Sequence, residues 1–311
     1  MWDEPGSYAM SRQHHFPSAV PQCMVLLLIV PIAISARTDA AAACDRCLLA
    51  GSSMMAEKIN LNADIAEGWG AYDIGNDAAM MKIIKSASVA SGFHAGDPNT
   101  MHRLCMLAKQ EGVSIGVHPG FNDLWGFGRR RIQMKPNDLE FMVAYQIGAL
   151  QAMACYSGLK VTHLKPHGAL NNMAAEDADY AMAIGRAIKT VDRDIIYVAL
   201  HGSQMQKAAE KLGLRLAHEG FADRQYDDNG NLASRAIPGT VLKDPKAASE
   251  HALRMVRDGE VVSMSGKRLK VKVDTFCVHG DEATGVAVAG AVRQAFEAAG
   301  IEVVPLTAMQ L

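Results

Sequence analysis

From residue 58 onward, short runs rich in β-forming residues alternate with amphipathic stretches of helix length. This alternation is typical of repeated strand–helix–strand units around a parallel sheet. The expected strands number seven, and they are Ile59–Ala63, Ala87–Ser91, Val113–Val117, Val161–Leu164, Ile195–Leu200, Leu214–Ala217 and Val271–Val278. Seven parallel strands suit either a closed barrel or an open sheet, so the pattern predicts an α/β fold.

The clearest helix signal follows the second expected strand. Asp97 can accept hydrogen bonds from the first free N–H groups, Pro98 occupies a position where no donor is missed, and Gly112 ends the pattern. Apolar residues at spacings of three and four place one face of this helix on the sheet. The stretches Leu139–Tyr156 and Asp177–Thr190 repeat the pattern, so we expect helices to follow strands along the chain.

The composition excludes several classes of protein. The chain has 311 residues, and its 31 basic and 33 acidic residues give a formal net charge of −2. This balance provides no bulk electrostatic attraction to nucleic acid or to an anionic membrane. The six cysteines lack the even, close spacing of a secreted disulfide framework. We therefore expect reduced thiols, a cytoplasmic location, and neither nucleic acid nor membrane as a partner.

The first 53 residues do not continue the alternating pattern. Their apolar run, Met24–Ile34, is interrupted by a proline and is shorter than the roughly 20 residues of a membrane-spanning helix. Met54 and Met55 stand directly before the first expected strand. We interpret residues 1–53 as an extension that is disordered or stems from a mis-assigned start, with a cleaved export signal as the alternative. No linker or repeat interrupts residues 54–311, which we predict to form one catalytic domain.

Chemically reactive side chains follow the ends of the expected strands. In parallel α/β folds ligands bind at the C-terminal ends of the strands, because only that rim brings many segments together over one cavity. Four ends carry a His beside Gly or Pro, in the runs SGFHAGDP, GVHPG, KPHG and VHGD, and these residues are His94, His118, His167 and His279. The other ionisable residues at these ends are Asp64, Glu67, Lys165, His201 and Asp281. We expect these side chains to surround a common cavity.

Each of these residues also has a structural interpretation. A single His after a strand is more often a hydrogen-bonded structural group than a catalyst, but four such placements on one rim favour catalysis for at least two. Asp97 is a helix cap first and a substrate-binding group second. Lys165 is either solvated or the partner of an oxyanion. Arg129, in the run Arg129–Arg131, can hold a carboxylate or phosphate or belong to a solvated charged surface.

Two further segments bear on function. Residues Phe221–Thr240 string turn-forming residues together, and a loop of about twenty residues usually serves as a lid or a binding loop. The segment Ser265–Arg268 departs from a phosphate-binding loop at two positions, and the glycine-rich dinucleotide motif is absent. The sequence therefore indicates no nucleotide site of its own.

Several ordered motifs resemble those of one protein family. They cover about residues 58–306 and read NLNADIAEGWG, SASVASGFHAGDP, IGVHPGFNDLWGFGRR, YQIGAL, HLKPHGAL, EGFADRQYDDNGNLASR and CVHGD. The chain resembles the LamB/YcsF family, which provides one component of bacterial ATP-dependent 5-oxoprolinase. The resemblance implies an irregular seven-stranded (β/α) barrel of the glycoside hydrolase/deacetylase type. It also implies cleavage of 5-oxo-L-proline to L-glutamate, coupled to ATP hydrolysis, in a complex with B and C subunits that supply the ATP site.

The same resemblance implies roles for the rim residues. Carried over position by position, the catalytic residues are Asp64, Glu67, His94, His118, Lys165, His167 and His279. The substrate-binding residues are Asp97, Arg129 and Asp281. The chain departs from the family pattern at Ser88, Val89 and Ser91, and at Asn171, where the family commonly has Tyr. These departures leave the ionisable residues intact and affect the substrate side of the site.

Two other functions are compatible with the same residues. The first is a metal-dependent amide hydrolase or deacetylase that acts alone, with Asp64, His94 and His118 as ligands of Zn²⁺ or a similar divalent ion. The second is a non-catalytic subunit that only presents the lactam to its partners. The metal content of the protein and the effect of replacing the imidazoles distinguish these functions from an ATP-dependent lactamase.

Overall fold

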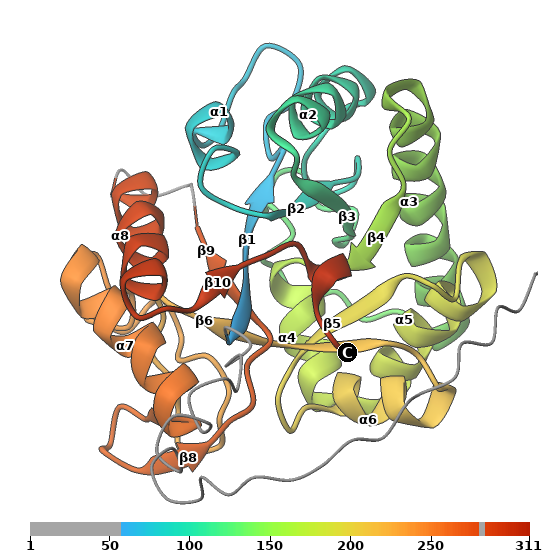
Figure 1. Ribbon diagram of the computed structural model, residues 1–311. Helices are drawn as coiled ribbons and strands as arrows, with labels where there is room; N and C mark the ends of the chain where they lie inside the picture. Colours follow the sequence, from blue (N-terminus) through green and yellow to red (C-terminus); the bar gives the residue numbers. More distant parts are fainter. Residues whose placement is uncertain (1–56, 280–283) are drawn as a thin grey trace, which may run out of the picture. The chain divides into compact units, whose positions relative to one another are not determined.

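Seven parallel strands form a closed barrel in the computed structural model, which describes residues 57–279 and 284–311 (Figure 1). The strands, in order around the barrel, are β1 (Lys58–Ile65), β2 (Ser86–Ala90), β3 (Ser114–His118), β4 (Val161–Leu164), β5 (Ile196–Leu200), β6 (Leu216–Phe221) and β9 (Thr275–Val278). The barrel closes where β9 pairs with β1, for example Asn60 with Thr275. The predicted α/β fold is confirmed, and the closure decides in favour of a barrel. The expectations for residues 1–53 and for Asp281 fall outside the described residues.

Helices connect the strands and cover the outside of the barrel (Figure 1). They are α1 (Asp77–Met80), α2 (Pro98–Glu111), α3 (Pro136–Ser157), α4 (Gly168–Glu176), α5 (Ala178–Val191), α6 (Gln204–Leu212), α7 (Pro245–Asp258) and α8 (Gly285–Ala298). The three helices predicted individually correspond to α2, α3 and α5. The cap predicted for α2 is present, because Asp97 accepts hydrogen bonds from the backbone of Asn99 and Thr100 and Gly112 adopts a left-handed conformation. No helix among the described residues is both long and apolar enough to cross a membrane.

Four short elements lie outside the barrel ring. Strands β7 (Glu260–Val262) and β8 (Arg268–Lys270) form an antiparallel pair. Their connection contains most of Ser265–Arg268, the segment that departs from a phosphate-binding loop. Strand β10 (Glu302–Val303) pairs with the start of β1. A 3₁₀ turn, η1 (Leu306–Ala308), follows it.

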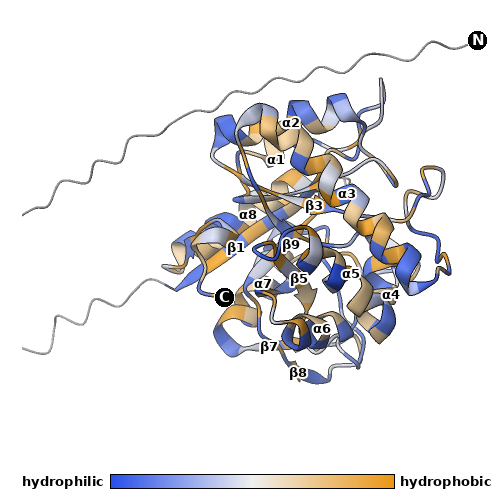
Figure 2. Cartoon of the chain, turned by 90° about the vertical axis from the view of Figure 1, so that its right-hand side faces the viewer, coloured by the Kyte–Doolittle hydropathy of each residue, from blue (hydrophilic) through white to orange (hydrophobic). Residues whose placement is uncertain are grey.

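Along strand β1, apolar side chains face the surrounding helices and polar side chains face the barrel interior. Ile59 and Leu61 are buried within the large apolar core, and the surrounding helices carry both apolar and hydrophilic residues, as expected for amphipathic helices on a sheet (Figure 2). Asn62 and Asp64 point into the barrel, because they contact side chains of β6 and β3 and of Lys165, which directly follows β4. None of these strands is a neighbour of β1. The alternation of side chains along a strand therefore gives this barrel a polar interior.

Hydrogen bonds between side chains fill the N-terminal half of this interior. Asn60 Nδ2 donates to Ser86 Oγ at 2.9 Å and to Val304 O at 2.7 Å. Thr275 Oγ1 donates to Asn60 Oδ1 at 2.6 Å and accepts from Asn62 Nδ2 at 2.8 Å. Buried polar groups are stable only when they are hydrogen-bonded, so these bonds make the polar interior compatible with a folded barrel.

The C-terminal residues close the N-terminal end of the barrel. The backbone N–H of Leu306 donates to Ser86 Oγ at 3.2 Å. The Leu306 side chain packs in a small apolar cluster with Ile196, Val198 and Ala217, near the starts of β5 and β6. The opposite, C-terminal end is the end that carries the reactive side chains.

Strand boundaries differ from the expectation at two places that matter for the site. The sixth expected strand ended at Ala217, whereas β6 continues to Phe221. The seventh was expected from Val271, whereas β9 begins at Thr275. The long connection predicted after the sixth strand is present, and it contains only isolated bridges, such as the one between Tyr226 and Leu232.

The interior of the barrel leaves no room for a side chain at Gly116. A Cβ atom there would lie 2.2 Å from His163 Cδ2, and the His163 ring is fully buried. We expect Gly116→Ala to lower the free energy of unfolding by about 1–3 kcal/mol, the usual cost of overpacking a core, as measured by urea denaturation. Gly148→Ala in α3 is the control, because no atom of the described residues crowds its Cβ position within 4 Å. Equal stability of the two variants would contradict this packing.

Burial of His163 also predicts how stability depends on pH. Burial, with Lys165 nearby, lowers the pKa of His163 to about 3. Below pH 6.5 the unfolded chain binds a proton at this residue while the folded chain does not, so stability falls as the pH drops from 6.5 towards 3. Between pH 7 and pH 5, His163→Gln should lose about 2 kcal/mol less stability than the unmodified chain. Denaturation at both pH values measures this, with the exposed His102→Gln expected to behave like the unmodified chain.

Candidate active site and metal centre

One cavity at the C-terminal end of the barrel collects most of the side chains expected at the rim. Its volume is about 350 Å³. The expected residues that line it are Asp64, Glu67, His118, Arg129, Lys165, His167 and His279. His94 lies behind this lining against Glu67, and Asp97 and His201 do not line the cavity. The structure therefore brings together side chains from the first to the last strand of the barrel.

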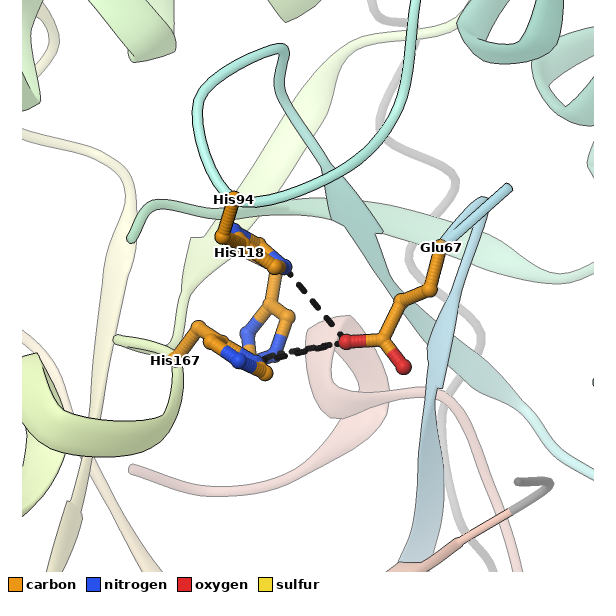
Figure 3. A group of neighbouring side chains, drawn as sticks. All are labelled: Glu67, His94, His118 and His167. Atoms are coloured by element: carbon orange, nitrogen blue, oxygen red, sulfur yellow. Dashed lines mark hydrogen bonds and ion pairs between the residues drawn. The ribbon is translucent and has the colours of Figure 1, made fainter. Parts of the chain in front are cut away.

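Three imidazoles and one carboxylate form a compact group, which we call the imidazole cluster: Glu67, His94, His118 and His167. Glu67 Oε1 lies 3.4 Å from His94 Nε2, 4.0 Å from His118 Nε2 and 3.3 Å from His167 Nδ1. The carboxylate of Glu67 reaches from the end of β1 towards all three rings (Figure 3). The rings of His94 and His167 are stacked, with 3.8 Å between their centroids.

Backbone carbonyl groups determine which nitrogen of two rings carries the proton. His118 Nδ1 lies 2.7 Å from Lys165 O, and His167 Nε2 lies 2.8 Å from Phe127 O. A carbonyl oxygen only accepts, so these nitrogens donate, and in a neutral imidazole the other nitrogen is then unprotonated. The unprotonated nitrogens, His118 Nε2 and His167 Nδ1, face each other at 3.0 Å. Two lone pairs at this distance repel each other unless a proton or a cation lies between them.

The electrostatics of the cluster favour the neutral form of His94 and His118. Burial, reinforced by the neighbouring His167, lowers the pKa of His94 to about 3, and burial likewise lowers the pKa of His118. Burial opposes ionisation of Glu67, but hydrogen bonding with His167 and His94 outweighs it and lowers the pKa of this carboxyl group. Neutral imidazoles beside an ionised carboxylate are the protonation states that metal ligands require.

These residues fit a divalent transition metal. The ligand atoms of the cluster lie within 4.8 Å of one another, and Glu67 Oε1 and both ring nitrogens of His94 are buried without a hydrogen-bond partner in the described part of the chain. Imidazole nitrogen with one carboxylate oxygen is a typical ligand set for Zn²⁺ and similar ions, and the carbonyl bonds to His118 and His167 are the outer-sphere contacts usual for such ligands. Of the expected ligands, His94 and His118 belong to the cluster, and Asp64 lies beside it, 3.3 Å from His118 Nε2.

Next to the cluster, a buried lysine is held by three acceptors. Lys165 Nζ lies 2.5 Å from Asp64 Oδ1, 3.3 Å from Glu219 Oε1 and 3.0 Å from Cys277 Sγ. Burial opposes the charge on Lys165, but Asp64 and its other neighbours outweigh that effect and raise the pKa of this amine. Burial raises the pKa of Glu219, although Lys165 lowers it in part. Lys165 is thus a fixed positive charge between an ionised Asp64 and a carboxyl group, Glu219, that favours its neutral form.

A second imidazole–carboxylate pair lies at the edge of the cavity. His279 Nδ1 bonds Asp223 Oδ2 at 2.7 Å. One ligand atom each from Asp64, Cys277 and His279 also falls within 4.8 Å of the others. The end of β9 and the loop after β6 therefore meet beside Lys165.

Two of the expected substrate-binding residues have structural contacts. Both oxygens of Asp97 accept hydrogen bonds, from Asn99, Thr100 and Gly70. Burial would raise the pKa of Asp97, but these bonds lower it to about 2. Arg129 lines the cavity, and its guanidinium lies 5.1 Å from the centroid of the Phe127 ring.

Three residues of the site were not among the expected ones: Glu219, Asp223 and Arg224 all line the cavity or contact a residue that does. Glu219 lies within β6 and Asp223 and Arg224 follow it, all past the point at which the sixth strand was expected to end. Continuing the alternation of that strand from Ala217 would have placed Glu219 on the same inward face.

The chain is similar to known proteins over the whole barrel. Residues 59–311 match the family model described as "LamB/YcsF family". The chain is 54% identical over 248 residues to the A subunit of 5-oxoprolinase from Rhodopseudomonas palustris (strain BisB18), which covers 79% of this chain and 97% of that protein. It is 49% identical over 254 residues to the A subunit of 5-oxoprolinase from Gluconobacter oxydans (strain 621H), which covers 82% and 100%. The crystal structure of a lactam utilization protein from Thermus thermophilus matches with a TM-score of 0.76 and 42% identity, covering 80% of this chain and 100% of that one.

The imidazole cluster makes a prediction about metal content. We expect the purified chain to bind one Zn²⁺ or similar ion, and Glu67→Gln to weaken that binding by at least about tenfold, because it removes the only carboxylate of the cluster. Elemental analysis after dialysis and competition with a chelator measure both quantities. Glu176→Gln is the control, since Glu176 lines the same cavity but pairs with Arg131 at its exposed edge. A chain that binds no such ion, or a Glu67 variant with unchanged affinity, would contradict the assignment.

Proposed function

Because this chain belongs to the LamB/YcsF family, we propose that it is the A subunit of a 5-oxoprolinase, which opens the ring of 5-oxo-L-proline to give L-glutamate. The relatives that carry this name match it over nearly their whole length. The observation that carries the proposal is the single cavity in which Lys165, Glu219 and the imidazole cluster meet. Its volume of about 350 Å³ lies at the small end of the range for ligand pockets, as suits a five-membered lactam.

Opening a lactam requires three events that this cavity can support. Water must add to the ring carbonyl and lose a proton, the carbonyl oxygen must carry negative charge, and the C–N bond must break as the nitrogen gains a proton. His279 lines the cavity and bonds the Asp223 carboxylate through Nδ1, so its other ring nitrogen can accept the proton from water. Lys165 stabilises the negative oxygen through its fixed charge, because its three N–H donors are held by protein acceptors.

Glu219 is the group best suited to protonate the leaving nitrogen. Its burial raises its pKa, so the neutral form, which has a proton to donate, is favoured. Asn62 Nδ2 donates to Glu219 Oε1 at 3.2 Å and restricts the orientation of the carboxyl group. Asp64, whose pKa is lowered, remains ionised and holds Lys165 in place. A divalent metal in the imidazole cluster would add a Lewis acid that polarises a carbonyl or lowers the pKa of a bound water.

We further propose that ring opening is driven by ATP hydrolysis and that the B and C subunits of the complex bind the nucleotide. The sequence has no phosphate-binding loop or dinucleotide motif, whereas the relatives are named as one lettered component of an assembly. A reaction that consumes ATP belongs in the cytoplasm, which suits the three free cysteines of the described residues, Cys105, Cys155 and Cys277.

The imidazole cluster also supports a second candidate function, a metal-dependent amide hydrolase that acts without ATP or partners. The two functions differ in what the isolated chain does. An ATP-dependent component releases glutamate from 5-oxoproline only with ATP and its partners, whereas a metal-dependent hydrolase acts on amides alone.

Glutamate release from 5-oxo-L-proline, measured with and without ATP and the partner subunits, tests the proposed function. We expect little turnover by the chain alone and ATP-dependent turnover by the complex. In the complex, Glu219→Gln should lower turnover by about 100-fold or more, the usual contribution of a general acid, while 5-oxoproline still binds. Binding without turnover would also exclude a protein that only presents the lactam.

Glu176→Gln is the matched control for this experiment, since it replaces another carboxylate that lines the cavity and should leave turnover unchanged. Full turnover by the chain alone would refute the proposed division between subunits. Unchanged turnover of the Glu219 variant would refute its role as the acid.

A further inference from the structure

Arg224 is an unusual residue for a cavity wall because its guanidinium is buried and incompletely bonded. It lies in the loop after β6 and lines the cavity, yet it is only 6% exposed. Its Nη2 donates to Ala233 O at 2.6 Å. Its Nε is buried and has no hydrogen-bond partner among the described residues. A buried cationic donor without an acceptor is costly, so the site is incomplete without an acceptor.

The residues around Arg224 do not provide that acceptor. Asp223 is its neighbour in sequence, but one Asp223 oxygen bonds His279 and the other has no hydrogen-bond partner among the described residues. No ion pair joins Arg224 to a carboxylate within the described part of the chain. Burial lowers the pKa of Arg224, and the positive charge of Arg235 lowers it further. Arg224 and Arg235 both line the cavity, so this wall carries positive charge.

Arg224 lies close in the chain to residues that contact the proposed reacting groups. Asp223 links it to His279, and His279 has a ring nitrogen within 4.8 Å of a ligand atom of Asp64. Arg224 therefore lies at the same cavity as Lys165 but on the wall formed by the loop after β6. 5-Oxoproline has two chemically different ends, the ring carbonyl that is cleaved and a carboxylate on the other side of the ring nitrogen. The cavity likewise has two different walls, one with Lys165 and one with Arg224 in the loop after β6.

We propose that Arg224 is the binding site for an oxyanion of the substrate, with the carboxylate of 5-oxo-L-proline as its occupant. This inference rests on the proposed function and assigns to Arg224 a role that the sequence had placed at Arg129. The loop after β6 then fixes which end of the lactam faces Lys165. A phosphoryl group on an activated substrate has the same oxyanion chemistry, and the experiment separates the two sources.

Binding to the full-length chain by isothermal titration calorimetry tests this proposal. The ligands are 5-oxo-L-proline, its neutral carboxamide, which keeps the ring but lacks the charge, and inorganic phosphate. We expect the unmodified chain to prefer the acid over the carboxamide by about 10- to 100-fold, the usual range for a hydrogen bond to a charged group. Arg224→Gln should remove this preference and leave carboxamide binding unchanged. Arg224→Lys, which keeps the charge, should retain part of the preference.

Arg131→Gln is the matched control, since Arg131 also lines the cavity but pairs with Glu176 at its exposed edge, and the preference should persist. If Arg224→Gln weakens phosphate binding but leaves the acid preference intact, the oxyanion is a phosphoryl group. The proposal is wrong if Arg224→Gln weakens binding of the acid and of the carboxamide equally. It is also wrong if this variant weakens binding of neither the acid nor phosphate. In both cases Arg224 has only a structural role, through its hydrogen bond to Ala233 O.

The outcomes also separate this proposal from the proposed function. A chain that binds phosphate through Arg224 but does not bind 5-oxoproline would retain the oxyanion site and refute the 5-oxoprolinase assignment. Equal binding of 5-oxoproline by the unmodified chain and by Arg224→Gln would refute the oxyanion site and leave the 5-oxoprolinase assignment intact. An unmodified chain that binds neither anion would refute the oxyanion site.

Discussion

The contact between Lys165 and Asp64, at 2.5 Å across the interior of the barrel, is the interaction on which the site depends. It joins the residue directly after β4 to β1, and these strands are not neighbours in the sheet. It also places a buried positive charge among Glu219, Cys277 and the imidazole cluster. Breaking such a pair leaves an uncompensated buried charge, which costs about 3–5 kcal/mol. The polar interior of the barrel, uncommon for a fold whose core is usually filled by apolar side chains, exists to hold this pair and the residues around it.

The fold was largely predictable because its signals are local. Strand–helix alternation, the cap of Asp97 and the glycine after α2 each depend on a few adjacent residues, and they led to an α/β fold with the right elements. The choice between a barrel and an open sheet depends on the pairing of β9 with β1, which joins distant parts of the chain. The resemblance to a family of barrel proteins, rather than the local pattern, favoured closure.

The site was predictable where a glycine or proline marks the end of a strand beside a histidine, as at His118 and His167. It was not predictable where the chemistry comes from strand interiors and long loops. Glu219 lies inside β6, which continues four residues beyond its expected end. Arg224 lies in a loop whose fold depends on contacts with Ala233 and β9. The tautomers of the imidazoles depend on two carbonyl groups, Lys165 O and Phe127 O, whose positions only the tertiary structure defines.

The packing of Leu306 against Ile196, Val198 and Ala217 fills the N-terminal end of the barrel and leaves the C-terminal rim as the end where a small molecule binds. The cavity that contains Lys165 is lined by residues at the opposite end of the barrel, from the ends of the strands and the loops that follow them. A protein docked over that rim would control both arrival and departure, so an intermediate could pass between two active centres without meeting bulk water.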